Sequence, residues 1–267
     1  MKVVQVWRKF PTNCRIMKPL YLTFLAVCMP FLMFAQSEAL YNIDVAIDPL
    51  EVRMLPLCDD PDPDEQQILR ETSGWKNWAA NHTNWRCIMS EATGLPHRAF
   101  GPAIDIPGFT IEDKASSFAE NTLNDFGVDT QIIWEIESKM GQHVWAHAYQ
   151  TWQGIPVKGG KLVTKWLNGQ LIMWGADWYR GIPEEVSEVL SLMAQEEAAT
   201  AGLTFDEWGD VEIGGLEWVP TRGQADDLVW HLCRTWTVSG RQSTIPRRYE
   251  TGINVQTGEV IWRQNQV

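Results

Sequence analysis

Residues 147–162 read HAYQTWQGIPVKGGKL, and this stretch decides the fold. Apolar and polar residues alternate on both sides of its centre, which predicts two half-buried strands joined at a corner. Pro156 keeps the residue before it extended and removes one donor from the ladder. Gly154, Gly159 and Gly160 allow backbone conformations that a Cβ would hinder. The sequence therefore predicts a strand, a corner and a second strand here.

Further strands surround this corner. Alternation with a period of two extends from residue 130 to residue 180, which is typical of β-structure. The apolar runs 162–167 and 170–174 are separated by Asn168-Gly169. An Asn-Gly pair favours a type I′ turn, because both central residues need a positive φ. These two runs are therefore predicted to form a hairpin.

Two helices interrupt the strands. Thr110 and Asp113 are spaced as a capping box, and apolar residues recur at helical spacing until Gly127 ends the helix. A second helix is predicted over 192–201, with Ser191 as its cap. Strands follow it over 208–219, 228–238, 248–255 and 259–263. The order helix, sheet, helix, sheet with hairpin connections predicts an α+β fold with antiparallel sheets.

The N-terminal region is typical of an exported protein. Residues 1–35 are predicted to be a signal peptide, since basic residues precede a short apolar run from 19 to 34. That run is too short for a stable membrane anchor, and Met17 is an alternative start. Residues 36–74 are polar and interrupted by proline, which predicts a linker or arm that includes the start of the first helix. We therefore expect a secreted or periplasmic protein.

Charge and cysteine content limit the possible partners and bonds. The chain carries 22 basic and 34 acidic residues, and five of the basic residues lie in residues 1–36, which have no acidic one. Residues 37–267 therefore have a formal charge of −17, which argues against binding nucleic acid. Beyond the signal peptide, Cys58, Cys87 and Cys233 are an odd number of thiols. Either Cys58 and Cys87 form a disulfide, or all three are unpaired.

The motif around the corner resembles a known family. Eight residues carry this resemblance, namely Tyr149, Gln150, Gly154, Ile155, Pro156, Val157, Gly159 and Gly160. Their pattern is similar to the fungalysin/thermolysin propeptide (FTP) domain of secreted zinc metalloproteases. The segment Trp85–Gly101 and the helix that ends at Phe126-Gly127 resemble other parts of this domain. The resemblance implies an FTP-like domain over residues 75–183.

The last third of the chain resembles a PepSY domain, which implies a second domain over residues 184–267. The family usually closes with Asp-Ala, where this chain has Asn254-Val255. Together the two resemblances imply two consecutive propeptide subdomains, each a cystatin-like sheet packed on a helix. They also imply a pro-region that assists the folding of a zinc metalloendopeptidase and inhibits it. The partner would be the cognate protease domain, in cis within a longer precursor or in trans.

No catalytic motif, cofactor site or metal site is predicted. The chain lacks the H-E-x-x-H motif of zinc proteases and the G-x-S-x-G motif of hydrolases. His143 and His147 share one strand face and leave a metal centre as a minor alternative, and His231 near Cys233 leaves a nucleophile pair as another. The chain is therefore predicted not to be an enzyme.

Fifteen tryptophans suggest a further role besides packing. Trp145, Trp152, Trp166 and Trp174 are candidates for a docking surface, because large aromatic side chains dominate protein interfaces. Core packing is the simpler explanation for most tryptophans in predicted strands. Two alternative functions remain open at this point: a standalone protease-inhibitor-like protein, and a tryptophan-rich carbohydrate-binding module.

Overall fold

The computed structural model describes most of the chain after residue 60. It covers residues 48, 50–52, 61–128, 134–223 and 227–267. The chain divides into two compact units, Met1–Pro49 and Leu50–Val267, and the second is described below. The predicted signal peptide and Cys58 lie outside the described residues. None of the helices in the described part has the length and apolar character needed to cross a bilayer.

Strands are the main secondary structure of the described residues. They are β1 (Arg86–Met89), β2 (Pro96–Ile104), β3 (Glu135–Met140), β4 (His143–Trp152), β5 (Ile155–Leu167), β6 (Gln170–Asp177), β7 (Glu207–Arg222), β8 (Leu228–Gln242), β9 (Ile245–Asn254) and β10 (Val260–Asn265). The helices are α2 (Pro63–Arg70), α3 (Ser73–Asn81), α4 (Ile111–Thr122), the 3₁₀ helix η1 (Leu123–Phe126) and α5 (Leu192–Thr200). The protein is therefore mostly β, with short helices.

The ten strands of the described residues belong to one hydrogen-bonded sheet. Its main path runs β1-β2-β6-β5-β7-β8-β9-β10, while β4 pairs with β5 and β3 pairs with β4. The pairings are antiparallel except that of β5 with β7, where Val157 and Trp218 are parallel partners. The sheet is mixed because β5 changes neighbours along its length. Its second half lies between β4 and β6, and its start also meets β7.

The predicted fold class is therefore wrong. We predicted separate antiparallel, cystatin-like sheets, each packed on a helix. The structure instead has one mixed sheet of ten strands with a few short helices. Local pairings were predicted well, and the hairpin at Asn168-Gly169 joins β5 to β6. The contact between Val157 and Trp218 was missed, because a pairing between strands far apart in the chain leaves no periodic signal in either strand.

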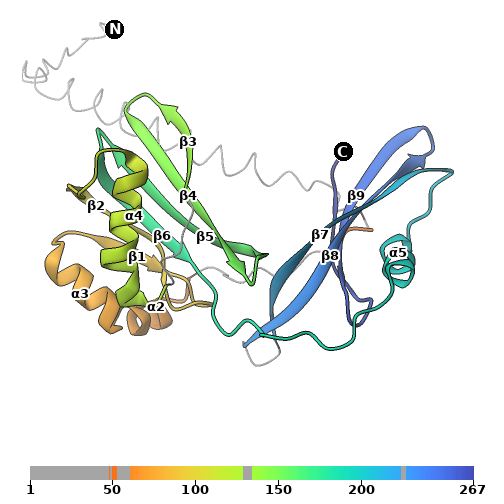
Figure 1. Cartoon of the computed structure of the whole chain (residues 1–267), viewed down its shortest axis with the longest axis horizontal. Coiled ribbons are helices and arrows are strands. Elements are labelled where there is room, and N and C mark those ends of the chain that lie inside the picture. The colour runs from red at the N-terminus through yellow and green to blue at the C-terminus, as the bar shows by residue number, and fades with distance from the viewer. Residues whose placement is uncertain (1–47, 49, 53–60, 129–133, 224–226) are drawn as a thin grey trace, which may run out of the picture. The chain divides into compact units, whose positions relative to one another are not determined.

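Helices α3 and α4 contribute to the core of the first half, which comprises β1–β6 (Figure 1). The predicted capping box of α4 is confirmed, since Thr110 and Asp113 exchange side-chain and backbone hydrogen bonds. Gly127 adopts φ 68° just after η1, as the helix end requires. Trp78 and Trp174 pack edge to face, with ring centroids 5.5 Å apart. The first half thus has one aromatic core between helices and sheet.

The second half comprises β7–β10 and α5. Trp236, Tyr249 and Ile253 form a core with Ala199 of α5. Arg263 of β10 lies buried beside this core, and its Nη2 donates to the carbonyls of Ala199 and Ala201 at 2.9 and 3.1 Å. A cation is favourable at this end of a helix, where carbonyls have no partner within the helix. Arg263 therefore fixes α5 to the sheet.

Candidate functional site

Gln150 ties the end of β4 to the chain that follows β6. Residues 178–191 link β6 to α5, and we call them the connector. The buried Gln150 side chain donates from Nε2 to the Tyr179 carbonyl at 2.6 Å, and its Oε1 accepts from the Tyr179 amide at 2.9 Å. One side chain thus satisfies both backbone groups of Tyr179, as a neighbouring strand would.

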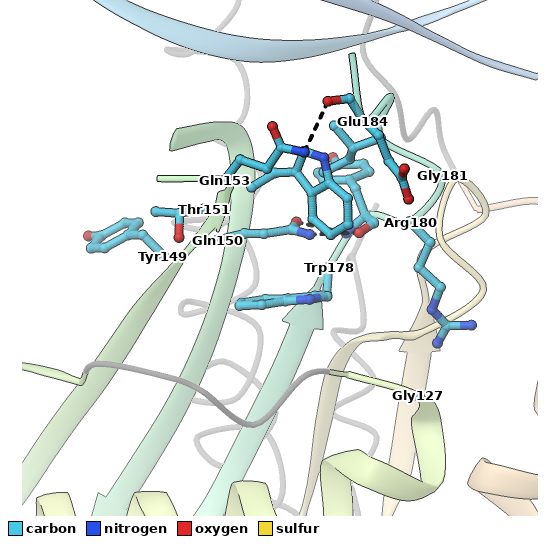
Figure 2. A pocket seen from close by; sticks show the side chains of 12 residues that line it. Gly127, Tyr149, Gln150, Thr151, Gln153, Trp178, Arg180, Gly181 and Glu184 are labelled. Atoms are coloured by element: carbon cyan, nitrogen blue, oxygen red, sulfur yellow. Dashed lines mark hydrogen bonds between the residues drawn. The ribbon is translucent and has the colours of Figure 1, made fainter. Parts of the chain in front are cut away.

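Two further side chains near the end of β4 hold the connector. Trp152 donates from Nε1 to the carbonyl of Pro183 at 3.0 Å. Gln153 donates from Nε2 to the carbonyl of Glu184, also at 3.0 Å, as the dashed line in Figure 2 shows. Together with Gln150, these contacts give the connector a defined path over the corner between β4 and β5.

The motif glycines are explained by this arrangement. Gln153 and Gly154 form the turn between β4 and β5 with φ values of 52° and 79°, which favour glycine at the second position. At Gly160, a Cβ would lie 2.6 Å from Oε1 of Gln150. Any side chain there would displace the glutamine amide from Tyr179. Gly160 and Gln150 are therefore required together.

The motif strand also joins the two halves of the sheet. Val157 is buried and lies in one apolar cluster with Tyr179 and with its parallel partner Trp218. The next residue, Lys158, points to the other face, because side chains alternate along a strand. Its Nζ lies 3.2 Å from Oε1 of Glu217 and 3.8 Å from the ring centroid of Trp262. We call this set of contacts the seam.

The eight motif residues differ in exposure. Gln150, Val157 and Gly160 are buried, Ile155 is half-buried, and Tyr149, Gly154, Pro156 and Gly159 are exposed. The buried ones form the connector contact and the seam, so much of the motif has a structural role. Sequence reasoning missed Lys158, which occupies the variable position of the motif. The sequence signal was that Lys158 directly follows the apolar Val157 in a predicted strand, so the two side chains must point to opposite faces of the sheet.

A cavity of about 620 Å³ lies between the end of β4 and the connector (Figure 2). Its walls combine aromatic and polar side chains, among them Tyr149, Trp178, Gln153 and Arg180. Arg180 also holds the connector in place, because its guanidinium donates to the carbonyl of Phe126. A cavity of this size and composition is suited to a small molecule or to a few residues of a partner.

The four candidate docking tryptophans are not equally accessible. Trp166 and Trp174 have no exposed surface and belong to the core of the first half. Trp152 is half-buried and holds the connector. Trp145 is half-buried, and Nζ of Lys165 lies 4.6 Å from its ring centroid. Among these four, Trp145 and Trp152 are the residues that present surface to a partner.

The candidate metal ligands His143 and His147 lie on β4. In the described part of the chain, no group of three or more His, Cys, Asp or Glu side chains is placed to hold a metal ion. A catalytic or structural metal normally needs at least three protein ligands. The two histidines alone do not make such a site.

His231 and Cys233 are held in structural roles. Burial raises the pKa of the Cys233 thiol to about 12, so it carries no thiolate at neutral pH. His231 lies between Thr221 and Asn254, with ring nitrogens 2.9 Å from Oγ1 and 3.1 Å from Nδ2, and burial lowers its pKa. Cys87 is also buried, and burial raises its thiol pKa to about 12.

Asn254 explains the departure from the Asp-Ala pattern. Its Oδ1 accepts from the backbone amides of Gln256 and Thr257 at 2.9 and 3.3 Å, which an aspartate would also do. Its Nδ2 lies against Nδ1 of His231 and is a donor, which an aspartate cannot supply. The asparagine therefore suits a neutral His231 whose Nδ1 accepts and whose Nε2 donates to Thr221.

Comparisons with known proteins give little guidance. No protein-family model matches the chain, and no curated protein matches it. Among solved structures, the Bacillus megaterium YpeB C-terminal domain is similar at 13% sequence identity, over 80% of this chain and 99% of that chain. The TM-score of 0.32 is too low to support an argument about fold or function.

Proposed function

We propose that this chain is an exported, non-catalytic module that binds a zinc metalloendopeptidase, assists its folding and inhibits it. The proposal starts from the resemblance of residues 75–183 to an FTP domain and of residues 184–267 to a PepSY domain. It places the module in the periplasm or outside the cell, after removal of the predicted signal peptide. The protease domain acts in cis or in trans.

One observation carries the proposal: the motif builds a cavity whose walls are fixed before a partner arrives. Gln150 holds the connector against β4 through two hydrogen bonds, and Trp152 adds a third. A preformed concave surface binds a polypeptide without the loss of conformational entropy that a flexible loop would incur. Tyr149, which is 51% exposed, is available at its rim.

Binding of this kind supports both folding assistance and inhibition. A module that binds the folded protease but not its unfolded chain stabilises the folded form. When the free module is at a concentration a hundred times the dissociation constant, the stabilisation is about 2.7 kcal/mol. The same contact covers protease surface and so hinders substrates. No reactive group of the module is needed for either effect.

A carbohydrate-binding module is less well supported. Sugar stacking requires several aromatic rings side by side on exposed surface. Ten of the fifteen tryptophans are buried in the cores, namely Trp75, Trp78, Trp85, Trp134, Trp166, Trp174, Trp178, Trp218, Trp236 and Trp262. Core packing therefore accounts for most of the tryptophan content.

Enzyme inhibition tests the proposal directly. The purified chain is titrated into thermolysin while hydrolysis of a quenched fluorescent peptide is followed, and intact mass is monitored to detect cleavage of the chain. We expect saturable inhibition that Gln150→Ala weakens at least tenfold and that Gln142→Ala, on exposed surface, leaves unchanged. The same chain should raise the yield of thermolysin refolded from denaturant. Absence of both effects at micromolar concentration contradicts the proposal.

A further inference from the structure

The sheet of the first half has a second face that the helices do not occupy. Residues alternate along each strand, so those next to the buried core residues point away from α3 and α4. We call this surface the open face. Its side chains come from five strands and are Arg86, Ile88, Arg98, Phe100, Trp145, His147, Tyr149, Lys161, Val163, Lys165 and Met173.

One row of the open face crosses all five strands in register. Trp145 on β4 pairs with Lys165 on β5, which pairs with Met173 on β6. Met173 pairs with Phe100 on β2, and Phe100 pairs with Arg86 on β1. Strands lie about 4.8 Å apart, so the row is about 19 Å long. Along it, the two cations Lys165 and Arg86 are separated by the apolar side chains of Met173 and Phe100, and Trp145 lies at the β4 end.

The row leaves apolar surface exposed beside its charges. Phe100 is 46% exposed and the neighbouring Ile88 is 41% exposed. Lys165 extends over the Trp145 ring, so its methylenes cover the sheet while the ammonium stays in water. The open face therefore combines exposed apolar area with arginine and lysine side chains, and its aromatic residues, Met173 and arginines are types that are enriched in protein interfaces.

The charge of this face contrasts with the rest of the molecule. Arg86, Lys161 and Lys165 form no ion pair with any residue that the structure describes. Arg98 is the exception, because its Nη1 lies 3.5 Å from the Asp177 carboxylate. The other carboxyl residues in register with the face, Glu135 and Glu137, belong to the edge strand β3. Asp177 of β6 also belongs to this face, opposite Lys161, so the positive charge without an ion-pair partner is that of Arg86 on β1 and of Lys161 and Lys165 on β5, in a chain whose residues 37–267 have a formal charge of −17.

We propose that the open face binds an extended acidic segment of the partner polypeptide. An extended chain rises about 3.3 Å per residue, so about six residues span the row. Acidic side chains would pair with Lys165 and Arg86, and apolar ones between them would contact Phe100 and Met173. The identity of the partner as a metalloendopeptidase rests on the proposed function, whereas the chemistry of the docked segment rests on the open face alone.

Charge geometry favours a short acidic peptide over a long polyanion. At physiological salt, screening limits the range of a cation's electrostatic attraction to about 8 Å, so the cations of the open face act only on nearby charges. A nucleic acid or sulfated polysaccharide would extend past the open face onto strongly acidic surface, where repulsion acts at every residue of the polymer. A peptide of about six residues stays within the row.

A fluorescent peptide tests this inference. The probe is a fluorescein-labelled hexapeptide, Glu-Ser-Leu-Ser-Glu-Ser, whose two glutamates and leucine share one face when the peptide is extended, and its binding to the purified chain is followed by anisotropy at two salt concentrations. The same hexapeptide with lysine in place of glutamate is the control probe. We expect saturable, salt-sensitive binding of the acidic probe only. The variant Lys161→Glu with Lys165→Glu should bind it at least tenfold more weakly and should bind the basic probe instead.

Matched variants guard against a trivial loss of structure. Lys76→Glu reverses an exposed charge on α3, away from the open face, and should keep wild-type affinity. Lys161 lies opposite Asp177 across β5 and β6, so charge reversal there can destabilise the sheet. Lys161→Gln with Lys165→Gln removes the charges without adding repulsion. If the double glutamate variant has a lowered melting temperature, the double glutamine variant is used for the binding measurement instead.

The outcomes separate this inference from the proposed function. Unchanged binding of the acidic probe by the Lys161 and Lys165 variants overturns the open-face inference, and so does displacement of the probe by an oligodeoxythymidylate at lower concentration than by unlabelled peptide. Dimerisation that the same variants abolish also overturns it, because the face would then serve a second copy. Probe binding without inhibition of thermolysin supports the open face and contradicts the metalloendopeptidase proposal.

Discussion

The two halves of the sheet bury their aromatic residues in different ways. In the first half, Trp166 and Trp174 belong to a single cluster to which α3 and α4 contribute. In the second half, buried residues are divided between the two faces, with Trp236 beneath α5 and Trp262 on the other side. The first half therefore depends on filled volume. The second half has one nine-residue helix and depends more on polar contacts such as that of Arg263.

The largest effect is expected in the filled core of the first half. Trp174→Ala removes a fully buried indole and should lower the free energy of unfolding by about 3–5 kcal/mol. Trp208 in the second half is 49% exposed, so Trp208→Ala should cost about 1 kcal/mol or less. Urea denaturation followed by far-UV circular dichroism measures both. Equal losses for the two variants would contradict the assignment of Trp174 to a filled core.

The second half should be most sensitive at Arg263. Arg263→Met leaves the buried carbonyl of Ala199 without its donor and removes a part-buried hydrogen bond to Ala201, and we expect a loss of about 1–3 kcal/mol. Hydrogen exchange should show α5 as the region that opens. Arg241→Met removes an exposed guanidinium and serves as the control, with little change expected. If the α5 amides of the Arg263→Met variant exchange as slowly as those of the wild type, packing alone holds the helix.

The connector should respond to Gln150 next. Gln150→Ala leaves both backbone groups of Tyr179 unpaired, and the expected loss is about 1–3 kcal/mol. The same substitution should make residues 178–191 susceptible to proteolysis, which mass mapping of the fragments would locate. Gly160→Ala should reproduce this result, because its Cβ would displace the glutamine amide. Resistance of the connector in both variants would contradict its proposed fixation.

Thiol reactivity compares one cysteine from each half. Burial raises the pKa of Cys87 and of Cys233 to about 12, from 9.0. Both should therefore react with iodoacetamide at pH 8 far more slowly in the folded chain than in denaturant, as peptide mapping would show. The folded chain keeps these protons above pH 9, whereas the unfolded chain releases them. Stability is thus complete below about pH 9 and falls as the pH rises toward 12.

The smallest effect is expected at His231. Burial lowers its pKa from the usual 6.5, so the unfolded chain binds a proton more readily than the folded one. Stability from the neutral ring is complete above about pH 6.5 and falls as the pH drops below that value. Melting temperatures measured from pH 7 to pH 5 should decrease, and less so for His231→Gln. A parallel decrease in both proteins would assign the effect to other groups.

Local structure could be predicted wherever neighbouring residues determine it. The α4 capping box, the turn at Asn168-Gly169 and the Ser191 cap of α5 all follow from short-range chemistry, and the structure contains each. The first helix, whose start was predicted within residues 36–74, is two helices, α2 and α3. Gly74 lies within α3, where a Cβ would come 2.8 Å from the Phe126 ring, so packing explains this glycine.

Long-range contacts could not be predicted in the same way. Nothing near Val157 indicates Trp218 as its partner, and that pair converts two expected sheets into one. The open face was likewise hidden, since the row from Trp145 to Arg86 depends on the register of four strand pairs. Trp166 and Trp174 were grouped with Trp145 and Trp152 because composition does not distinguish a core indole from an accessible one.

The seam has a consequence for biosynthesis. Lys158 and Glu217 are 59 positions apart, so the motif strand leaves the ribosome long before its partner strand is made. At about 5–20 residues per second, that interval lasts roughly 3–12 s. Throughout it, Val157 lacks its partner on β7, although β4 is already available to pair with the start of β5. The two halves of the sheet can therefore join through β5 and β7 only after β7 has been synthesised.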